Sequence, residues 1–244
     1  MKVLVIGETC VDKFIYGKIN RLSPEAPVPV FNPTRTTQNP GMAGNTAANV
    51  KALSPDISVW HLMQDENITK TRYVEDKSNH MFIRVDEGEE TISQFKWTPN
   101  VDEMLSEADV VIVSDYNKGF LLDNDLEEIA LKSKLSILDS KRKLTNDIIK
   151  KYTWVKLNES ESLNNPDLDY KNIIVTLGAK GAKINDILFK SPQSQETIDV
   201  SGAGDTFVAA FALNYFETKD EFAAVRYANM MASKVVTKKG VTTP

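Results

Sequence analysis

Cysteine and histidine are scarce in this chain, which has 244 residues, one cysteine and two histidines. The single cysteine, Cys10, excludes an intramolecular disulfide and a zinc site built from several cysteines. The two histidines, His61 and His80, do not have the H-E-x-x-H spacing of zinc proteases. Disulfide scaffolds and this class of zinc enzyme are therefore excluded.

A large excess of one charge and long apolar runs are also missing. The formal net charge is −5, which does not favour nucleic acid or an anionic membrane as the main partner. No apolar run approaches the length of a membrane span, and the first residues lack the pattern of a secretory signal. With 41% hydrophobic and 26% charged residues, the composition is that of a globular domain. We expect a cytoplasmic protein that binds neither nucleic acid nor membranes.

The common nucleotide-binding signatures do not occur either. The P-loop pattern G-x-x-x-x-G-K-[ST] is absent from the whole chain. After the first predicted strand, Gly7 is followed by Glu8, Thr9 and Cys10 rather than by G-x-G-x-x-G. The first absence excludes a P-loop protein, and the second argues against a Rossmann dehydrogenase.

Short apolar runs rich in β-branched residues alternate with helical patterns along most of the chain. We expect buried strands at 3–6, 57–62, 109–113, 135–138, 153–157 and 173–177. Helical patterns cover 41–53, 123–133, 143–151, 203–216 and 220–238, and a small hairpin is expected at 182–189. This alternation predicts an α/β fold with a mostly parallel sheet covered on both faces.

Two segments depart from the alternation. Residues 14–34 contain Pro24, Pro27, Pro29 and Pro33 between apolar residues. Proline cannot donate to a sheet ladder, so this segment predicts edge or extended strands. Residues 71–86 alternate like a hairpin. Together the two segments predict a small β lid beside the main sheet.

The strongest chemical signal is the segment 199–206, D-V-S-G-A-G-D-T, which precedes a long apolar helix. Gly202 and Gly204 bracket Ala203, and such glycines let backbone N–H groups at a helix start approach an anion. Asp205 beside them could accept a proton from an attacking hydroxyl group. A capped helix with a tight turn is the plainer interpretation, which the surrounding motif makes less favourable.

The motifs resemble the ribokinase-like (PfkB) carbohydrate kinase family, most closely its heptose-phosphate kinase branch. Residues 199–207 resemble the family pattern D-x-[ST]-G-A-G-D-T-F, 41–49 resemble G-G-x-x-N-x-A, 158–161 resemble N-x-x-E, and 176–181 resemble T-x-G-x-x-G. Residues 21–30 resemble R-[IL]-S-P-E-A-P-V-P-V and 114–119 resemble S-D-Y-x-K-G, which are more specific to the branch. The matches run in family order from Gly7 to Thr243. The resemblance implies one kinase domain over 1–244, a three-layer α/β/α sandwich with a β lid.

The resemblance also implies roles for individual residues. Asp205 would be the catalytic base, next to an anion hole formed by Gly202, Ala203 and Gly204. The residues implied in substrate binding are Asp12, Gly41, Asn45, Asp115 and Lys118. Those implied in nucleotide binding are Asn158, Glu161, Gly178, Gly181, Asn229 and Lys141, with Asn158 and Glu161 holding Mg²⁺ through water. The cofactors implied are ATP and Mg²⁺, with a monovalent cation left open, and a homodimer that pairs through the lid is expected.

Several of these residues have a plainer structural interpretation. Asp12 and Asp115 could cap turns at strand ends, and Asn158 with Glu161 could form an ordinary helix start. Lys141 lies in a basic cluster that could be a solvated face, and Asn229 could lie on a helix surface. A sugar phosphate also needs cations, for which Arg21, Arg72, Arg84 and Lys118 are the candidates.

The chain departs from the family pattern at four positions and in length. Met42 stands in place of a second glycine, where a positive φ would be costly. Ser140, Lys156 and Leu157 replace residues expected as proline, threonine or serine, and proline. The region 62–71 is short, which predicts a reduced sheet edge. The leading hypothesis is phosphorylation of a heptose 7-phosphate at its anomeric O1. The alternatives are a kinase for another sugar or a nucleoside, and a non-catalytic sugar-phosphate-binding homologue.

Overall fold

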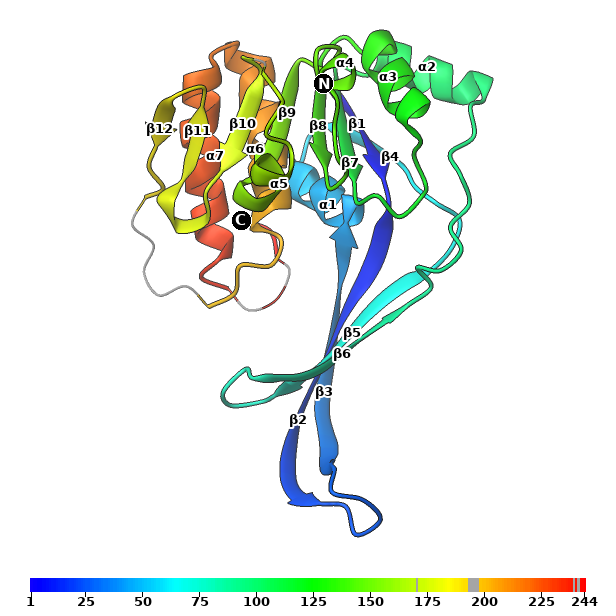
Figure 1. Cartoon of the computed structure of the whole chain (residues 1–244), viewed down its shortest axis with the longest axis vertical. Coiled ribbons are helices and arrows are strands. Elements are labelled where there is room, and N and C mark those ends of the chain that lie inside the picture. The colour runs from blue at the N-terminus through cyan, green and yellow to red at the C-terminus, as the bar shows by residue number, and fades with distance from the viewer. Residues whose placement is uncertain (170, 193–197, 239, 241) are drawn as a thin grey trace.

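The computed structural model describes residues 1–169, 171–192, 198–238, 240 and 242–244. Its main body is a three-layer sandwich around an eight-stranded sheet (Figure 1). In spatial order the strands are β12 (Ile187–Phe189), β11 (Ala182–Ile184), β10 (Ile173–Thr176), β9 (Trp154–Asn158), β8 (Ser136–Ser140), β7 (Val110–Asp115), β1 (Lys2–Gly7) and β4 (Ser58–Leu62). The six from β10 to β4 are parallel, and β11 and β12 are antiparallel. The predicted α/β class with a mostly parallel sheet is confirmed.

The alternation of side chains along β1 explains why both faces of the sheet are covered. Val3 and Val5 face one core and Leu4 and Ile6 the other, and all four are fully buried. The first face is covered by α1 (Ala43–Leu53), α6 (Ala203–Thr218) and α7 (Glu221–Val235). The second is covered by α2 (Pro99–Glu107), α3 (Asp123–Lys132) and α4 (Asn146–Ile149). The short helix α5 (Glu159–Asn164) and the 3₁₀ turn η1 (Gly178–Lys180) follow β9 and β10.

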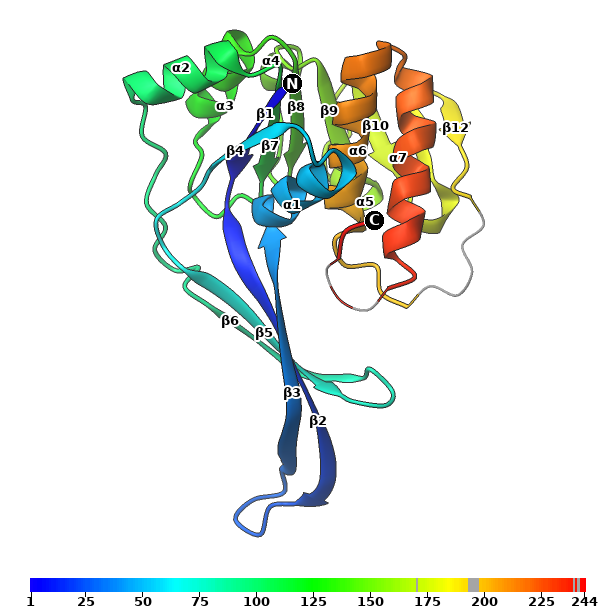
Figure 2. The ribbon, with the colours of Figure 1, turned by 180° about the vertical axis from the view of Figure 1, so that it is seen from behind.

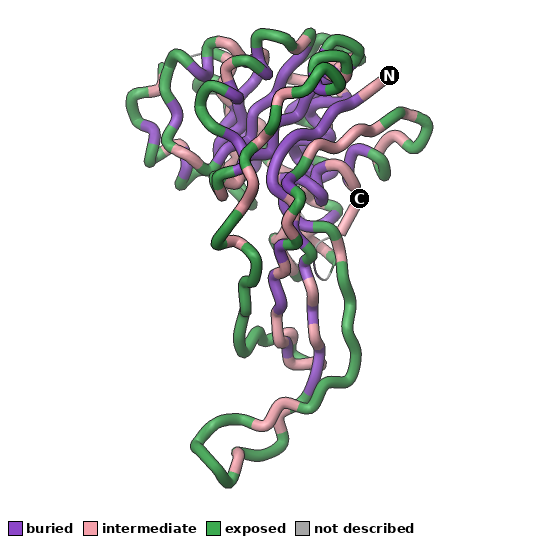
Figure 3. The backbone as a smooth tube through the Cα atoms, turned by 90° about the vertical axis from the view of Figure 1, so that its right-hand side faces the viewer, coloured by how far each residue is buried: buried purple, intermediate pink, exposed green. Residues whose placement is uncertain are grey.

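A second sheet of four strands projects from the main body (Figures 1 and 2). Its order is β3 (Pro29–Met42), β2 (Thr9–Leu22), β5 (Ile68–Glu75) and β6 (Met81–Glu87). The segments expected to form a lid, 14–34 and 71–86, lie in this sheet, whose strands β2 and β3 are longer than the sequence indicated. One face buries Cys10, Asp12, Phe14 and Tyr16. The far end of the β2–β3 hairpin is exposed (Figure 3).

Helix boundaries are where the sequence patterns were least accurate. The pattern at 143–151 forms helix only over Asn146–Ile149, and the helix expected to reach 238 ends at Val235. Helix α2 was not predicted, because it contains few apolar residues and only Val101 and Leu105 of its nine residues are buried. In the part of the chain that is described, no helix has the length and apolar character needed to cross a lipid bilayer.

The start of α1 shows the consequence of the methionine that replaces a glycine. Met42 precedes the helix with φ 57° and ψ −135°, a conformation that L-residues rarely adopt. Its side chain is buried against Cys10 and Ile68, and this packing offsets part of the backbone strain. The left-handed turn expected for glycine is therefore kept in this chain.

Because the six parallel strands run in one direction, their carboxyl ends meet at one edge of the central sheet. The second sheet leaves the body at that edge, since β2 begins two residues after β1 ends. Open α/β sheets bind ligands at this edge. The sequence motifs at 114–119, 158–161 and 176–181 begin at the carboxyl ends of β7, β9 and β10 and reach the same edge.

Candidate active site

The N-terminus of α6 carries Asp205, the predicted base. Gly202 caps the helix with φ 79°, a left-handed conformation that glycine adopts without a Cβ penalty. The Ala203 N–H donates to the Val200 carbonyl oxygen over 3.3 Å. A helix of 16 residues concentrates positive potential at its first turn. The Ala203 N–H is thus used inside the turn, and an anion hole formed by Gly202, Ala203 and Gly204 remains a prediction.

A chain of buried hydrogen bonds between α1 and α6 orients Asp205. Asn45 Nδ2 donates to Asp205 Oδ2 over 2.8 Å, and Asn49 Nδ2 donates to Asn45 Oδ1 over 3.0 Å. The Thr206 hydroxyl donates to Asn49 Oδ1 over 2.7 Å. On the other side, the Tyr116 hydroxyl donates to Asp205 Oδ1 over 3.1 Å. Each oxygen of the carboxylate therefore has one donor with a fixed position.

Burial is the main reason that the pKa of Asp205 is raised from 3.8 to about 6. The hydrogen bond from Asn45 opposes this rise, the negative charge of Asp139 adds to it, and Lys156 and Tyr116 oppose it. A carboxyl group that loses its proton near pH 6 is a base at neutral pH with a stronger affinity for protons than an exposed aspartate. This property suits the role that the sequence predicts for it.

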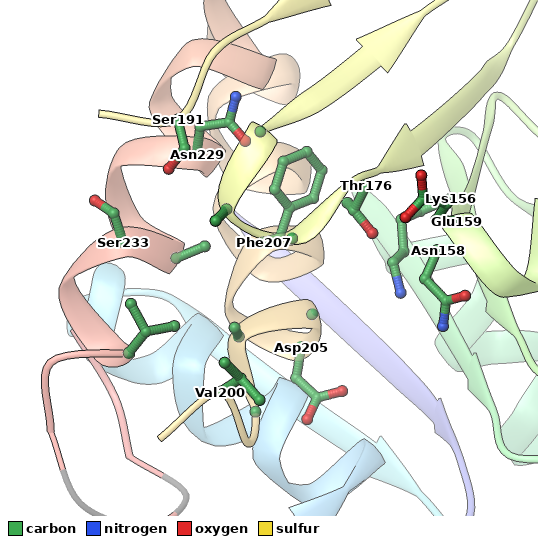
Figure 4. Close-up of a pocket in the computed structure, with 18 of the residues that line it drawn as sticks. Lys156, Asn158, Glu159, Thr176, Ser191, Val200, Asp205, Phe207, Asn229 and Ser233 are labelled. Carbon is green, nitrogen blue, oxygen red and sulfur yellow. The ribbon is translucent and has the colours of Figure 1, made fainter. Parts of the chain in front are cut away.

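The ammonium groups of Lys141 and Lys156 line the same cleft as Asp205. Lys156 Nζ is 2.9 Å and 3.0 Å from the two oxygens of Asp139, and both side chains are only 4% exposed. Lys141 Nζ is 2.6 Å from Glu161 Oε1 and 3.6 Å from Asp139 Oδ1. Figure 4 shows the Lys156 amine directed to the space between Asp205 and Asn158. The site thus has fixed positive charge next to the start of α6.

Asn158 and Glu161 form a capping box at the start of α5, as the plainer interpretation proposed. Asn158 Oδ1 accepts from the Glu161 N–H over 2.8 Å, and Glu161 Oε2 accepts from the Asn158 N–H over 2.7 Å. Asn158 Nδ2 also donates to Glu161 Oε1 over 2.7 Å. Among the described residues no group of three or more histidine, cysteine or acidic side chains could hold a metal ion by itself. A metal role for this pair therefore remains a prediction.

A cleft of about 850 Å³ brings together most of the residues predicted to bind nucleotide (Figure 4). They are Lys141, Asn158, Gly178, Gly181 and Asn229, together with Gly202, Ala203, Gly204 and Asp205. Gly181 has φ 103°, and a Cβ there would lie 2.1 Å from the Phe189 carbonyl oxygen, so glycine is required. The Asn229 amide already donates to that carbonyl over 2.9 Å.

Of the predicted substrate residues, Asp12 and Gly41 lie together on the neighbouring strands β2 and β3, and Asn45 contacts Asp205. A Cβ on Gly41 would lie 2.1 Å from Asp12 Oδ2, which shows how closely the two strands approach here. Arg72 forms an ion pair with Asp12. Asn45, in the first turn of α1, donates to Asp205 by the bond described above. Asp12 and Gly41 thus lie in the part of the second sheet next to the body, and Asn45 alone of the three is shown to bond to Asp205.

The other two predicted substrate residues are placed differently. The carboxylate of Asp115 is fully buried and accepts from Arg142 Nε over 2.6 Å and Arg142 Nη2 over 2.9 Å. The Asp115 carboxylate faces the Arg142 guanidinium, as expected of a residue that stabilises the end of a strand. Its position does not indicate direct contact with a substrate. Lys118 pairs with Glu89 over 2.5 Å, and Lys70 pairs with the same carboxylate over 2.6 Å. Lys118 thus lies at the junction with the second sheet.

Sequence reasoning missed the roles of Glu8, Tyr116 and Arg142 and treated Lys156 only as a departure from a pattern. Glu8 and Tyr116 directly follow β1 and β7, so their place at the carboxyl ends of parallel strands was the available signal. The partners of Arg142 and Lys156, Asp115 and Asp139, also end or lie in neighbouring strands. These pairings depend on strand order, which one sequence does not reveal.

Comparison with solved structures identifies the fold. The structure of Arabidopsis thaliana ribokinase complexed with ribose and ATP matches with a TM-score of 0.71 and 18% identity, over 98% of this chain and 93% of that one. Escherichia coli phosphofructokinase-2 in complex with potassium matches with a TM-score of 0.74 and 16% identity, over 98% and 93%. The predicted ribokinase-like fold is confirmed.

Curated relatives and a family comparison identify the family. The bifunctional protein HldE of a Nitratiruptor species is 28% identical over 295 residues, which cover 99% of this chain and 63% of the relative. HldE of Helicobacter pylori is 29% identical, over 98% and 63%. The chain thus spans less than two thirds of these relatives. Residues 56–244 match the family described as pfkB family carbohydrate kinase, and the chain belongs to this family of phosphotransferases that act on a sugar hydroxyl.

Proposed function

We propose that the protein transfers the γ-phosphate of ATP to the anomeric O1 of a heptose 7-phosphate, with Asp205 as the general base. The observation that carries the proposal is the buried Asp205 carboxylate at the start of α6, with a pKa raised to about 6. The branch-specific motif at 21–30 and the HldE relatives support the choice of a heptose phosphate.

In the proposed reaction Asp205 accepts the proton of the sugar O1 as that oxygen attacks the γ-phosphorus. The bond from this phosphorus to the β–γ bridging oxygen breaks, and ADP leaves. The Asn45 amide and the Tyr116 hydroxyl hold the carboxylate in one orientation. The start of α6 and the Lys141 and Lys156 amines stabilise the negative charge on the phosphoryl group. In-line transfer needs this positioning more than it needs covalent chemistry, and the cleft provides it.

ATP would occupy the cleft, and Mg²⁺ would be held beside it by few protein ligands and by phosphates and water. Asn158 and Glu161 would hold the metal, which would neutralise charge on the β- and γ-phosphates. Glu161 is 8% exposed and its carboxylate also contacts Lys141, so water would lie between it and the metal. Gly178, Gly181 and Asn229 would lie along the nucleotide.

The second sheet would bind the sugar phosphate and act as a lid. Lys70 and Arg72 project from its buried face and Lys118 from the main body, which puts cations close to Asp12. The opposite face exposes apolar side chains, including Val11, Ile83 and Val85. We expect this face to pair with a second copy of the chain, because an exposed apolar sheet needs cover.

A substrate panel tests the proposed function. Purified protein is incubated with ATP, Mg²⁺ and one sugar at a time, including heptose 7-phosphate, fructose, ribose and a nucleoside, and ADP release is measured beside Asp205→Asn. We expect turnover with heptose 7-phosphate alone and none in the variant. Turnover with another acceptor would keep the kinase and reject the substrate. Sugar-phosphate binding without turnover, unchanged in the variant, would support a non-catalytic homologue.

Gly41→Ala tests the sugar side of the site separately. The new methyl group would collide with Asp12 Oδ2 at 2.1 Å and with Cys10 Sγ at 2.6 Å, so it displaces the carboxylate that would hold sugar hydroxyls. We expect the KM for the sugar phosphate to rise about tenfold or more and the KM for ATP to change less than about twofold. Steady-state kinetics with each substrate varied in turn measures both.

Gly44→Ala is the matched control for that variant. Its Cβ would contact a Thr9 methyl group at 2.9 Å and would leave Asp12 alone. If both variants raise the KM for the sugar equally, the displacement of Asp12 is not the cause.

A further inference from the structure

Glu8 is a buried carboxylate with an unusual set of partners. It lies directly after β1 and is fully buried. Glu8 Oε2 accepts from the Tyr116 N–H over 2.8 Å, and Oε1 accepts from the N–H groups of Lys118 and Phe120 over 2.8 Å and 3.4 Å. Three backbone donors from one loop therefore compensate the lost hydration of this carboxylate.

The loop at 116–120 needs such an acceptor to keep its shape. Asn117 has φ 55° and Gly119 has φ 100°, so two of its residues are in the left-handed region. The alternation turns successive N–H groups toward one side, which is the geometry of an anion-binding nest. In this protein the anion is Glu8, the residue that directly follows the neighbouring strand β1. The loop is thus held from the end of β1, in addition to the bond from its own Asn117 N–H to Asp115 Oδ1.

The loop holds Tyr116 against the base. The Tyr116 side chain lines the cleft, and its hydroxyl donates to Asp205 Oδ1 over 3.1 Å while Asn45 donates to Oδ2 over 2.8 Å. Two donors on two different oxygens set the plane of the carboxylate. The lone pairs that remain are then held in a fixed direction, as a base that accepts a proton from a positioned hydroxyl group requires.

We infer that Tyr116 is a positioning residue for Asp205 and that Glu8 keeps Tyr116 in place through the backbone of loop 116–120. The inference deepens the proposed function, because it takes Asp205 as the base. Hydrogen bonds from α1 and from the residue after β7 then both orient the Asp205 carboxylate. Asn45 is fixed by Asn49 and Thr206, and Tyr116 is fixed by Glu8.

Tyr116→Phe removes only the hydroxyl group and tests whether Tyr116 positions Asp205. The titration of Asp205 is followed by NMR on protein with ¹³C-labelled aspartate carboxyl groups, where the signal is assigned by its loss in Asp205→Asn. The wild-type pKa is raised to about 6. We expect the midpoint in Tyr116→Phe to move up by about one pH unit, because a donor to the charged form is lost. The charged groups that also face Asp205, Asp139, Lys141 and Lys156, are unchanged.

In kinetics we expect kcat to fall about 10- to 100-fold, with the acid limb of the pH profile moved in the same direction. Tyr152→Phe is the matched control, since Tyr152 is also a buried phenol and donates to the Leu126 carbonyl oxygen over 2.8 Å, away from the cleft. It should change neither titration nor kcat. An unchanged Asp205 midpoint in Tyr116→Phe overturns the inference. The titration needs no substrate, so it decides this point even if no sugar is phosphorylated.

Glu8→Gln tests whether Glu8 holds Tyr116 in place through the backbone of loop 116–120. Glutamine keeps the size but turns an amide donor toward the loop N–H groups. We expect a loss of kcat similar to that of Tyr116→Phe and no further loss in the double variant, because both act on one hydrogen bond. Glu8→Asp, which keeps the acceptor charge, should recover part of the activity and show that the chain still folds. Losses that multiply in the double variant would reject an action of Glu8 through Tyr116.

Discussion

Asp205→Asn should lower kcat by about 10³-fold or more while the protein remains folded. General base catalysis contributes about 10²- to 10⁴-fold, and the amide cannot accept the proton of the attacking hydroxyl. Asparagine has nearly the same shape, and its oxygen can still accept from Asn45. Binding of ATP should change little, because the start of α6 and the Lys156 amine remain. Single-turnover kinetics and nucleotide titration measure the two quantities.

The same variant should be more stable than the wild type at neutral pH. The folded-state pKa of Asp205 is raised from 3.8 to about 6 by burial, so the folded protein binds more protons than the unfolded chain between these values. The charged carboxylate therefore lowers the free energy of unfolding as pH rises through this window, by about 2–3 kcal/mol above pH 6. Asparagine is neutral at every pH and avoids this cost.

Denaturant unfolding at pH 4 and at pH 8 tests whether Asp205→Asn raises or lowers the free energy of unfolding. We expect Asp205→Asn and wild type to differ little at pH 4, and the variant to be more stable at pH 8. Wild-type activity should fall about tenfold for each pH unit below 6, because only the charged form is a base. A variant that is inactive and also less stable at pH 8 would show that the carboxylate has a structural role instead.

Much of the fold could be predicted because the apolar runs are short and separate. The runs at 3–6 and 109–113 are buried strands, and the proline-containing segment 14–34 lies in the second sheet as an extended hairpin. The lengths of β2 and β3 could not be predicted, because residues such as Thr36 and Gln38 have polar, exposed side chains and pair only through their backbones. Hydrophobic periodicity does not record such pairing.

In the candidate site, too, the residues of local motifs could be predicted, and the contacts between distant segments could not. Asp205, Asn45 and the glycines around them belong to local motifs, and the structure brings them together in one place. Glu8 and Tyr116 meet across 108 residues of sequence, and their contact depends on the order of β1 and β7 in the sheet. A single sequence contains no signal for such a contact, because either residue alone is typical of a strand end.

Lys156→Met should lower the free energy of unfolding by about 3 kcal/mol at neutral pH. The change leaves Asp139 in an interior that is 4% exposed without its closest cation, and removing one partner of a buried ion pair typically costs about 3–5 kcal/mol. Lys141, 3.6 Å from the same carboxylate, compensates part of the loss. Lys141→Met is the matched control, and since its side chain is 32% exposed we expect a loss of about 1 kcal/mol.

The pH dependence and a double variant identify the cause of that loss. Burial would raise the pKa of Asp139, but the charges of Lys156 and Lys141 outweigh it and hold the pKa below 3.8. This pair therefore adds stability above pH 4 that is lost as pH falls, the opposite of the behaviour of Asp205. In thermal and denaturant unfolding, the difference in free energy of unfolding between Lys156→Met and wild type should shrink toward low pH. Adding Asp139→Asn to Lys156→Met should restore most of the stability, because no unpaired charge is then left buried. A deficit that stays constant with pH and persists in the double variant would instead assign Lys156 a packing role, independent of its charge.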